Sequence, residues 1–140
     1  MVVTEEQMLE DIPANLSNVQ VLSLINRGII NSRYLLILKQ LTSFSDEVVS
    51  NWLNINVKTY RTYKKAEVEL KEDVQEHTVL LLALMKHGID VFGEKENFSR
   101  WLDTENFFFD KRKPMEFLNT ISGIKFINDQ LTGMEYGDNA

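Results

Sequence analysis

Residues able to carry acid–base or metal chemistry are sparse in this chain of 140 residues. It contains no cysteine, which excludes disulfide bonds, thiolate nucleophiles and cysteine-based zinc sites. Its two histidines, His77 and His87, would lie about 15 Å apart along a single helix, too far to share a metal ion. We expect His77 on the surface and His87 near the carboxyl end of a helix, where positive charge is favourable.

Motifs of the common enzyme classes are missing as well. The chain has no glycine-rich phosphate loop, no Gly-x-Ser-x-Gly and no His-Glu-x-x-His. Adjacent acids such as Glu72 and Asp73 point in different directions on a helix, so they are poorly placed to act together. The sequence therefore predicts a protein that is not an enzyme and that uses no cofactor or metal ion.

Cations that could bind phosphate are gathered in one part of an acidic chain. The net charge is −6, yet the segment 17–66 carries seven bases against two acids. A basic island of this kind is typical of a localised phosphate-binding face. On charge alone, ordinary solvated side chains remain the simpler interpretation.

The segment 44–65, FSDEVVSNWLNINVKTYRTYKK, adds a packing pattern to this charge. Ser45 is a good helix N-cap, and the two acids after it favour the positive end of the helix dipole. A small residue, a left-handed turn former, an apolar plug and a second N-cap follow in order: Ser50, Asn54, Ile55 and Asn56. This spacing predicts two helices joined by a tight turn, as in a helix-turn-helix.

The second of these helices would bury Val57 and Tyr60 and turn a polar face outward. Lysine and arginine reach phosphates or guanine edges, and threonine and asparagine contact phosphates or bases. The expected DNA-binding residues are Asn56, Lys58, Thr59, Arg61, Thr62 and Lys65. The alternative is an amphipathic helix whose basic face meets only solvent.

The rest of the chain also favours helices. Apolar residues recur at helical spacing over Val19–Ile29, Leu35–Leu41 and Val74–Ile89, the last closed by Gly88 and Gly93, whereas strand patterns are poor. We therefore expect an all-α fold of roughly eight helices.

The acidic start is unlike a signal peptide and no apolar run is long enough to cross a membrane, so a cytoplasmic protein is expected.

Short motifs follow one another in a fixed order between Val91 and Gly137: aliphatic-Phe-Gly, Trp-Leu, Asn-x-x-Phe, Pro-x-x-x-Leu, Thr-x-x-Gly and Glu-Tyr-Gly. In this order they resemble the toxin-binding domain of Xre/MbcA/ParS antitoxins. Upstream, Arg27-Gly28-Ile29 and the segment 44–60 are similar to the Xre-like helix-turn-helix that precedes this domain, although that family usually has glycine where this chain has Asn54.

The resemblance implies an antitoxin that binds and inhibits a RES-type, NAD-consuming toxin, represses its own operon by binding operator DNA, and self-associates as a dimer. It divides the chain into an acidic segment 1–16, an Xre-like helix-turn-helix subdomain 17–70 and a small helical toxin-binding subdomain 71–140. The alternatives are a stand-alone helix-turn-helix transcription regulator with a C-terminal dimerisation domain, and a helical adaptor that never contacts DNA.

Aromatic and acidic residues near the carboxyl end are candidates for toxin binding. Trp101 is expected in the core, but three consecutive phenylalanines cannot all face one way, so at least one should meet a partner. The residues after Gly133 are expected to form a short flexible end whose acids could plug a cationic active site. The expected toxin-binding residues are Phe107, Phe108, Phe109, Met134, Glu135, Tyr136 and Asp138.

Overall fold

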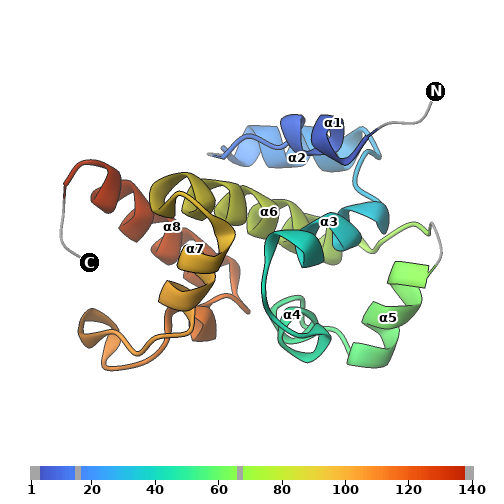
Figure 1. Ribbon diagram of the computed structural model, residues 1–140. Coiled ribbons are helices and arrows are strands. Elements are labelled where there is room, and N and C mark those ends of the chain that lie inside the picture. Colours follow the sequence, from blue (N-terminus) through green and yellow to red (C-terminus); the bar gives the residue numbers. More distant parts are fainter. Residues whose placement is uncertain (1–3, 15–16, 66–67, 138–140) are drawn as a thin grey trace.

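The computed structural model describes residues 4–14, 17–65 and 68–137. Over these ranges it contains eight α-helices, two short 3₁₀ helices and no strand, which confirms the prediction of an all-α fold (Figure 1). The helices in chain order are α1 Glu5–Glu10, α2 Asn18–Asn26, α3 Arg33–Leu41, α4 Asp46–Trp52, α5 Val57–Lys65, α6 Glu72–Phe92, α7 Lys95–Leu102, η1 Phe107–Phe109, η2 Pro114–Phe117 and α8 Ile121–Glu135.

Helix α6 is the longest element and runs through the middle of the molecule (Figure 1). Helices α2, α3, α7 and α8 all pack against it. Its central residues Leu81, Leu82 and Leu84 point to different sides of the helix, because neighbouring residues are about 100° apart around the axis, yet all three are buried. A helix that is apolar on every side must be enclosed by others, and here its neighbours supply that cover.

Gly88 and Gly93 were both expected to close this helix, but α6 continues through Gly88 to Phe92. The ring of Phe98 lies directly over Gly88, and a Cβ atom there would come within 2.2 Å of it. Gly88 is therefore a point of close helix packing, since it lets α7 approach the α6 backbone. The helix ends at Gly93, whose φ of 88° is the left-handed C-cap conformation that glycine adopts most easily.

Both predictions about the histidines are wrong, because α6 is buried and long. His77 is buried instead of lying on the surface, and its Nε2 is 2.9 Å from the carbonyl oxygen of Leu118. His87 is also buried and lies inside α6, not at its carboxyl end. Within residues 4–14, 17–65 and 68–137, no group of three or more His, Cys, Asp or Glu side chains lies together in a way that could hold a metal ion.

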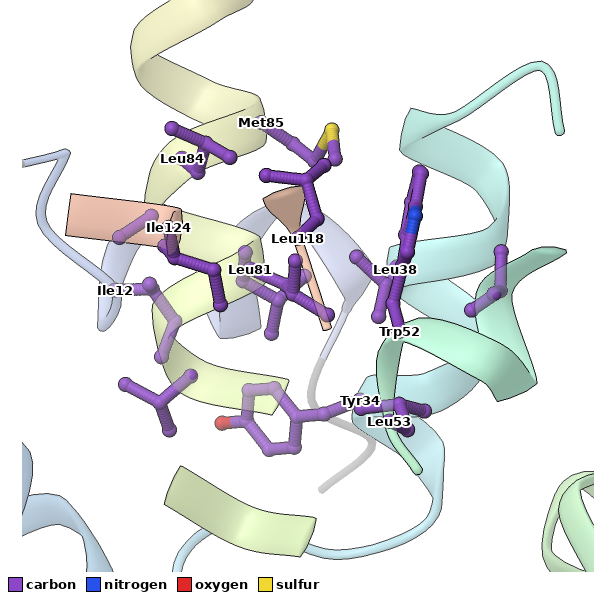
Figure 2. Packing of buried hydrophobic residues seen from close by; sticks show 14 of the residues in the cluster. Ile12, Tyr34, Leu38, Trp52, Leu53, Leu81, Leu84, Met85, Leu118 and Ile124 are labelled. Atoms are coloured by element: carbon purple, nitrogen blue, oxygen red, sulfur yellow. The ribbon is translucent and has the colours of Figure 1, made fainter. Parts of the chain in front are cut away.

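One cluster of buried apolar side chains extends from Met8 in α1 to Leu131 in α8. Figure 2 shows members of this cluster from several helices around a common centre: Leu38, Trp52, Leu81, Leu84, Met85, Leu118 and Ile124. Polar bonds reinforce the junction between α4 and the segment around η2. Trp52 Nε1 donates to Met115 O at 3.0 Å, and Asn54 Nδ2 donates to Asn119 O at 2.8 Å.

Burial of His77 makes stability depend on pH. Desolvation lowers the pKa of His77 below its ordinary value, so the unfolded chain binds a proton on this residue at a higher pH than the folded chain does. The stabilisation that comes from keeping His77 neutral is fully present above about pH 6.5, and it is lost as the pH falls through the lowered pKa. We expect the free energy of unfolding, measured by urea denaturation, to fall between pH 7 and pH 5.

The variant His77→Gln retains an N–H donor for Leu118 O but cannot titrate. It should show a smaller loss of unfolding free energy over the same pH interval. Asp46, whose pKa is lowered mainly by its hydrogen bond to Lys64, loses its stabilising contribution only below about pH 5, so it does not mask the effect. Equal pH dependence in the wild type and the variant would contradict this assignment.

Candidate interaction surfaces

Helices α4 and α5 are joined by the kind of turn that the sequence predicts. Ser45 Oγ accepts a hydrogen bond from Val48 N at 3.3 Å and caps α4. Asn54 has a φ of 58° and forms the left-handed turn, and Asn56 Oδ1 accepts from Lys58 N at 2.7 Å at the start of α5. The predicted cap, turn and second cap are therefore all present in this segment.

The predicted outward face of α5 lies at the surface. Tyr60 is fully buried and holds the helix to the core. The side chains predicted to contact DNA are all exposed: Asn56, Lys58, Thr59, Arg61, Thr62 and Lys65. They share one helix and its amino-terminal cap, as expected from their spacing.

Arg61 is exposed, but the acids at the start of α4 hold its guanidinium group. Arg61 Nε lies 3.2 Å from Asp46 Oδ2, and its Nη2 lies 2.9 Å from Glu47 Oε1. Asp46 also accepts from Lys64 Nζ at 2.7 Å. The hydrogen bond from Lys64 is the main reason that the pKa of Asp46 is lowered.

This ion cluster could not be read from the sequence, which assigned Asp46 and Glu47 only to the start of a helix. The cluster has no net charge, since two acids face two bases. Within the parts of the chain that the structure describes, Lys58 and Lys65 are the α5 cations without an ion pair.

A second surface feature is the loop 106–112, which displays two phenylalanines. Phe107 and Phe108 are 80% and 64% exposed, and their rings contact each other edge to face with centroids 6.1 Å apart. Asn106 closes the loop. Its Oδ1 accepts from Phe108 N at 2.9 Å, its N donates to Arg112 O at 3.0 Å and its O accepts from Lys111 N at 3.0 Å.

The loop is strained as well as closed. Asp110 and Lys111 have φ values of 53° and 62°, and such left-handed conformations cost about 1–3 kcal/mol each in residues other than glycine. They persist only where surrounding contacts impose them. The backbone that displays the two phenylalanines is therefore held in one conformation.

Phe109 connects this loop to the core. It was predicted to bind a partner together with its two neighbours, but it is only 5% exposed. Its ring centroid lies 6.1 Å from Trp101, 5.8 Å from Phe117 and 5.4 Å from Phe126. Phe109 thus anchors the loop in the core, while Trp101 packs partly buried against the same core, as expected.

Helix α8 begins at a motif with a clear packing reason. Thr120 Oγ1 accepts from Gly123 N at 2.9 Å, which caps the helix. A Cβ atom at Gly123 would lie 1.7 Å from the carbonyl oxygen of Phe117. The Thr-x-x-Gly spacing therefore allows η2 and α8 to meet without a clash.

The carboxyl end is more ordered than the sequence suggested, because α8 continues through Gly133 to Glu135. Met134 packs against the core, and the Glu135 carboxylate contacts His87 Nε2. The expectation of a flexible end directly after Gly133 is therefore wrong. Tyr136 is exposed, and Asp138 lies outside the described residues.

Residues 87–137 match the family described as Antitoxin Xre/MbcA/ParS C-terminal toxin-binding domain. This part of the chain is similar to that domain. No curated protein matches the chain. The match confirms the resemblance of the segment from Val91 to Gly137 and supports a role as the antitoxin of a toxin–antitoxin system.

The toxin-binding domain contains the loop 106–112 and the end of α8. It begins at His87 and ends at Gly137, so both members of the contact between His87 and Glu135 belong to it. Helices α4 and α5 lie outside the matched range. Over residues 4–14, 17–65 and 68–137, no helix is long and apolar enough to span a membrane.

Proposed function

We propose that this protein is an antitoxin that binds and inhibits a RES-type, NAD-consuming toxin and represses its own operon as a dimer. The observation that carries the proposal is the match of residues 87–137 to an antitoxin toxin-binding domain. Within this range, the chain displays two exposed phenylalanines, Phe107 and Phe108, on a closed loop. The RES class of the toxin, the NAD-consuming reaction and the dimer rest on the sequence resemblance.

Phe107 and Phe108 have the properties of interface anchors. Burying a phenylalanine ring contributes about 1.5–3 kcal/mol, and aromatic side chains dominate binding energy at protein interfaces. The closed loop holds the backbone that carries both rings in place before binding, so little backbone conformational entropy is lost when a partner covers them. The exposed charges of Asp110, Lys111 and Arg112 beside them suit the polar rim of such an interface.

The variant Phe107→Ser/Phe108→Ser should bind the toxin at least about a hundredfold more weakly, since two anchors are removed at once. The measurement is calorimetric titration of the purified product of the neighbouring gene, combined with rescue of growth when that product is expressed. Both rings lie outside the core, so the thermal midpoint of the variant should stay close to that of the wild type.

Val19→Ser/Leu22→Ser is a matched control, because these α2 side chains are 76% and 55% exposed but lie outside the toxin-binding domain. Its affinity for the toxin should equal that of the wild type. Equal losses in both double variants would show that the loop is not the specific contact. Failure of the wild type to form a complex with the neighbouring gene product would refute the proposed function.

Binding of operator DNA is proposed for the exposed face of α5. Its support is the geometry of a capped helix, a left-handed turn and a second capped helix whose exposed residues are cationic or hydroxylated. Lys58 and Lys65 are available for phosphates, while Arg61 is held by Asp46 and Glu47. We therefore assign Lys58 and Lys65 the main electrostatic role and Arg61 mainly the fixing of α5 against α4.

Lys58→Glu/Lys65→Glu should abolish the mobility shift of the protein's own promoter fragment, because phosphate contacts dominate affinity. Inhibition of the toxin should be unchanged. The variant Lys111→Glu/Lys125→Glu makes the same charge change on exposed lysines outside α5 and should retain the shift. A wild-type shift that does not weaken with rising salt would contradict a phosphate-based interface.

The stand-alone transcription regulator remains the alternative function. It shares the α5 face with the antitoxin but needs no toxin. A promoter shift without any complex with the neighbouring gene product would favour it, and sedimentation of the free protein tests the proposed dimer in either case.

A further inference from the structure

The last turn of α8 is tied to the buried interior by a histidine. The His87 side chain is 3% exposed, and each of its ring nitrogens faces an oxygen on α8. Nδ1 lies 2.6 Å from Asn128 Oδ1, and Nε2 contacts the carboxylate of Glu135. These three residues, called the α8 clasp below, join the two ends of the toxin-binding domain.

Within the clasp, the Glu135 carboxylate is the hydrogen-bond acceptor of His87. A carboxylate only accepts hydrogen bonds, so Nε2 must carry the proton that it donates to Glu135. The amide of Asn128 can face Nδ1 with either its oxygen or its nitrogen, and it can therefore serve either state of the ring. A charge-assisted bond from a buried donor is stronger than an ordinary hydrogen bond, and it competes with any external cation for this carboxylate.

We propose that Glu135 is a positioning residue which acts through His87, and that Tyr136 is the group at this end of the domain that contacts the toxin. This inference rests on the proposed toxin binding and replaces the expected contact between Glu135 and the toxin. Met134 packs against the core and Glu135 binds His87, so the turn before Tyr136 is held from two sides.

Tyr136 is well placed for this role. It is 84% exposed, and its backbone N donates to Gly133 O at 3.1 Å, so its main chain is fixed while its ring is free. Gly137 then turns away with a φ of 88°. An exposed tyrosine on a fixed backbone fits a partner surface with an apolar slot and a hydrogen-bonding group at its end.

Four single variants separate positioning from direct contact. Glu135→Ala and His87→Leu break the clasp, whereas Glu135→Gln and His87→Gln keep a hydrogen bond without the carboxylate or the imidazole. We expect the first two to bind the neighbouring gene product about tenfold more weakly and the last two to bind nearly as the wild type does. The double variant His87→Leu/Glu135→Ala should be no weaker than either single one. Tyr136→Ala should lose affinity with the clasp intact.

Direct contact between Glu135 and a cationic toxin site gives the opposite pattern and would overturn the inference. Then Glu135→Gln would bind as poorly as Glu135→Ala, and His87→Leu would bind at least as well as the wild type because the carboxylate is released. Normal affinity in Tyr136→Ala would also overturn it.

Hydrogen exchange of the free protein provides a readout that needs no toxin. The amides of residues 134–137 should exchange faster in Glu135→Ala and His87→Leu than in the wild type and the two glutamine variants. Unchanged exchange in all four variants would refute the clasp. Absence of any complex with the wild type, together with the expected exchange pattern, would instead refute the proposed function and leave the clasp standing as a structural tie.

Discussion

Burial of α6 on nearly every side is the constraint to which the other helices conform. Polar side chains inside a buried helix need hydrogen-bond partners, because an unsatisfied polar group in the interior destabilises the fold. Most polar groups of α6 have one, although Gln75 Oε1 has none among the described residues. Gln75 donates to Leu70 O at 2.6 Å, His77 bonds to Leu118 O and His87 to Glu135. Each bond fixes a different neighbour, so the few polar residues of α6 determine where the chain around it must lie.

A few hydrogen bonds also join α4 and the turn that follows it to the toxin-binding domain. Trp52 at the end of α4 packs in the shared cluster and bonds to Met115 O, two residues before the end of η2. Asn54 in the following turn bonds to Asn119 O, just before α8 begins. A displacement of η2 by a bound partner would therefore be felt at the turn that orients α5.

Local features of this fold could be predicted from the sequence, whereas features that depend on distant partners could not. Caps, the left-handed turn at Asn54 and the burial of Tyr60 follow from a few adjacent residues, and all are present. The burial of His77 and His87 depends on helices that are far away in sequence. The pairing of Arg61 with Asp46 and Glu47 and the separation of Phe109 from Phe107 and Phe108 are of the same kind. Asn54 combines both cases. Its left-handed backbone favours glycine, but glycine has no side chain that could donate to Asn119 O as Asn54 does.

The loop 106–112 has a consequence for how such a protein can change over time. Its shape is set by Asn106, by two left-handed residues and by the buried ring of Phe109, and not by the two exposed rings. Residues 107 and 108 can therefore diverge without weakening the fold, which leaves their identity free to follow the surface of a partner. A cell that holds several duplicated pairs could keep them from cross-reacting by exchanging two side chains on an otherwise constant scaffold.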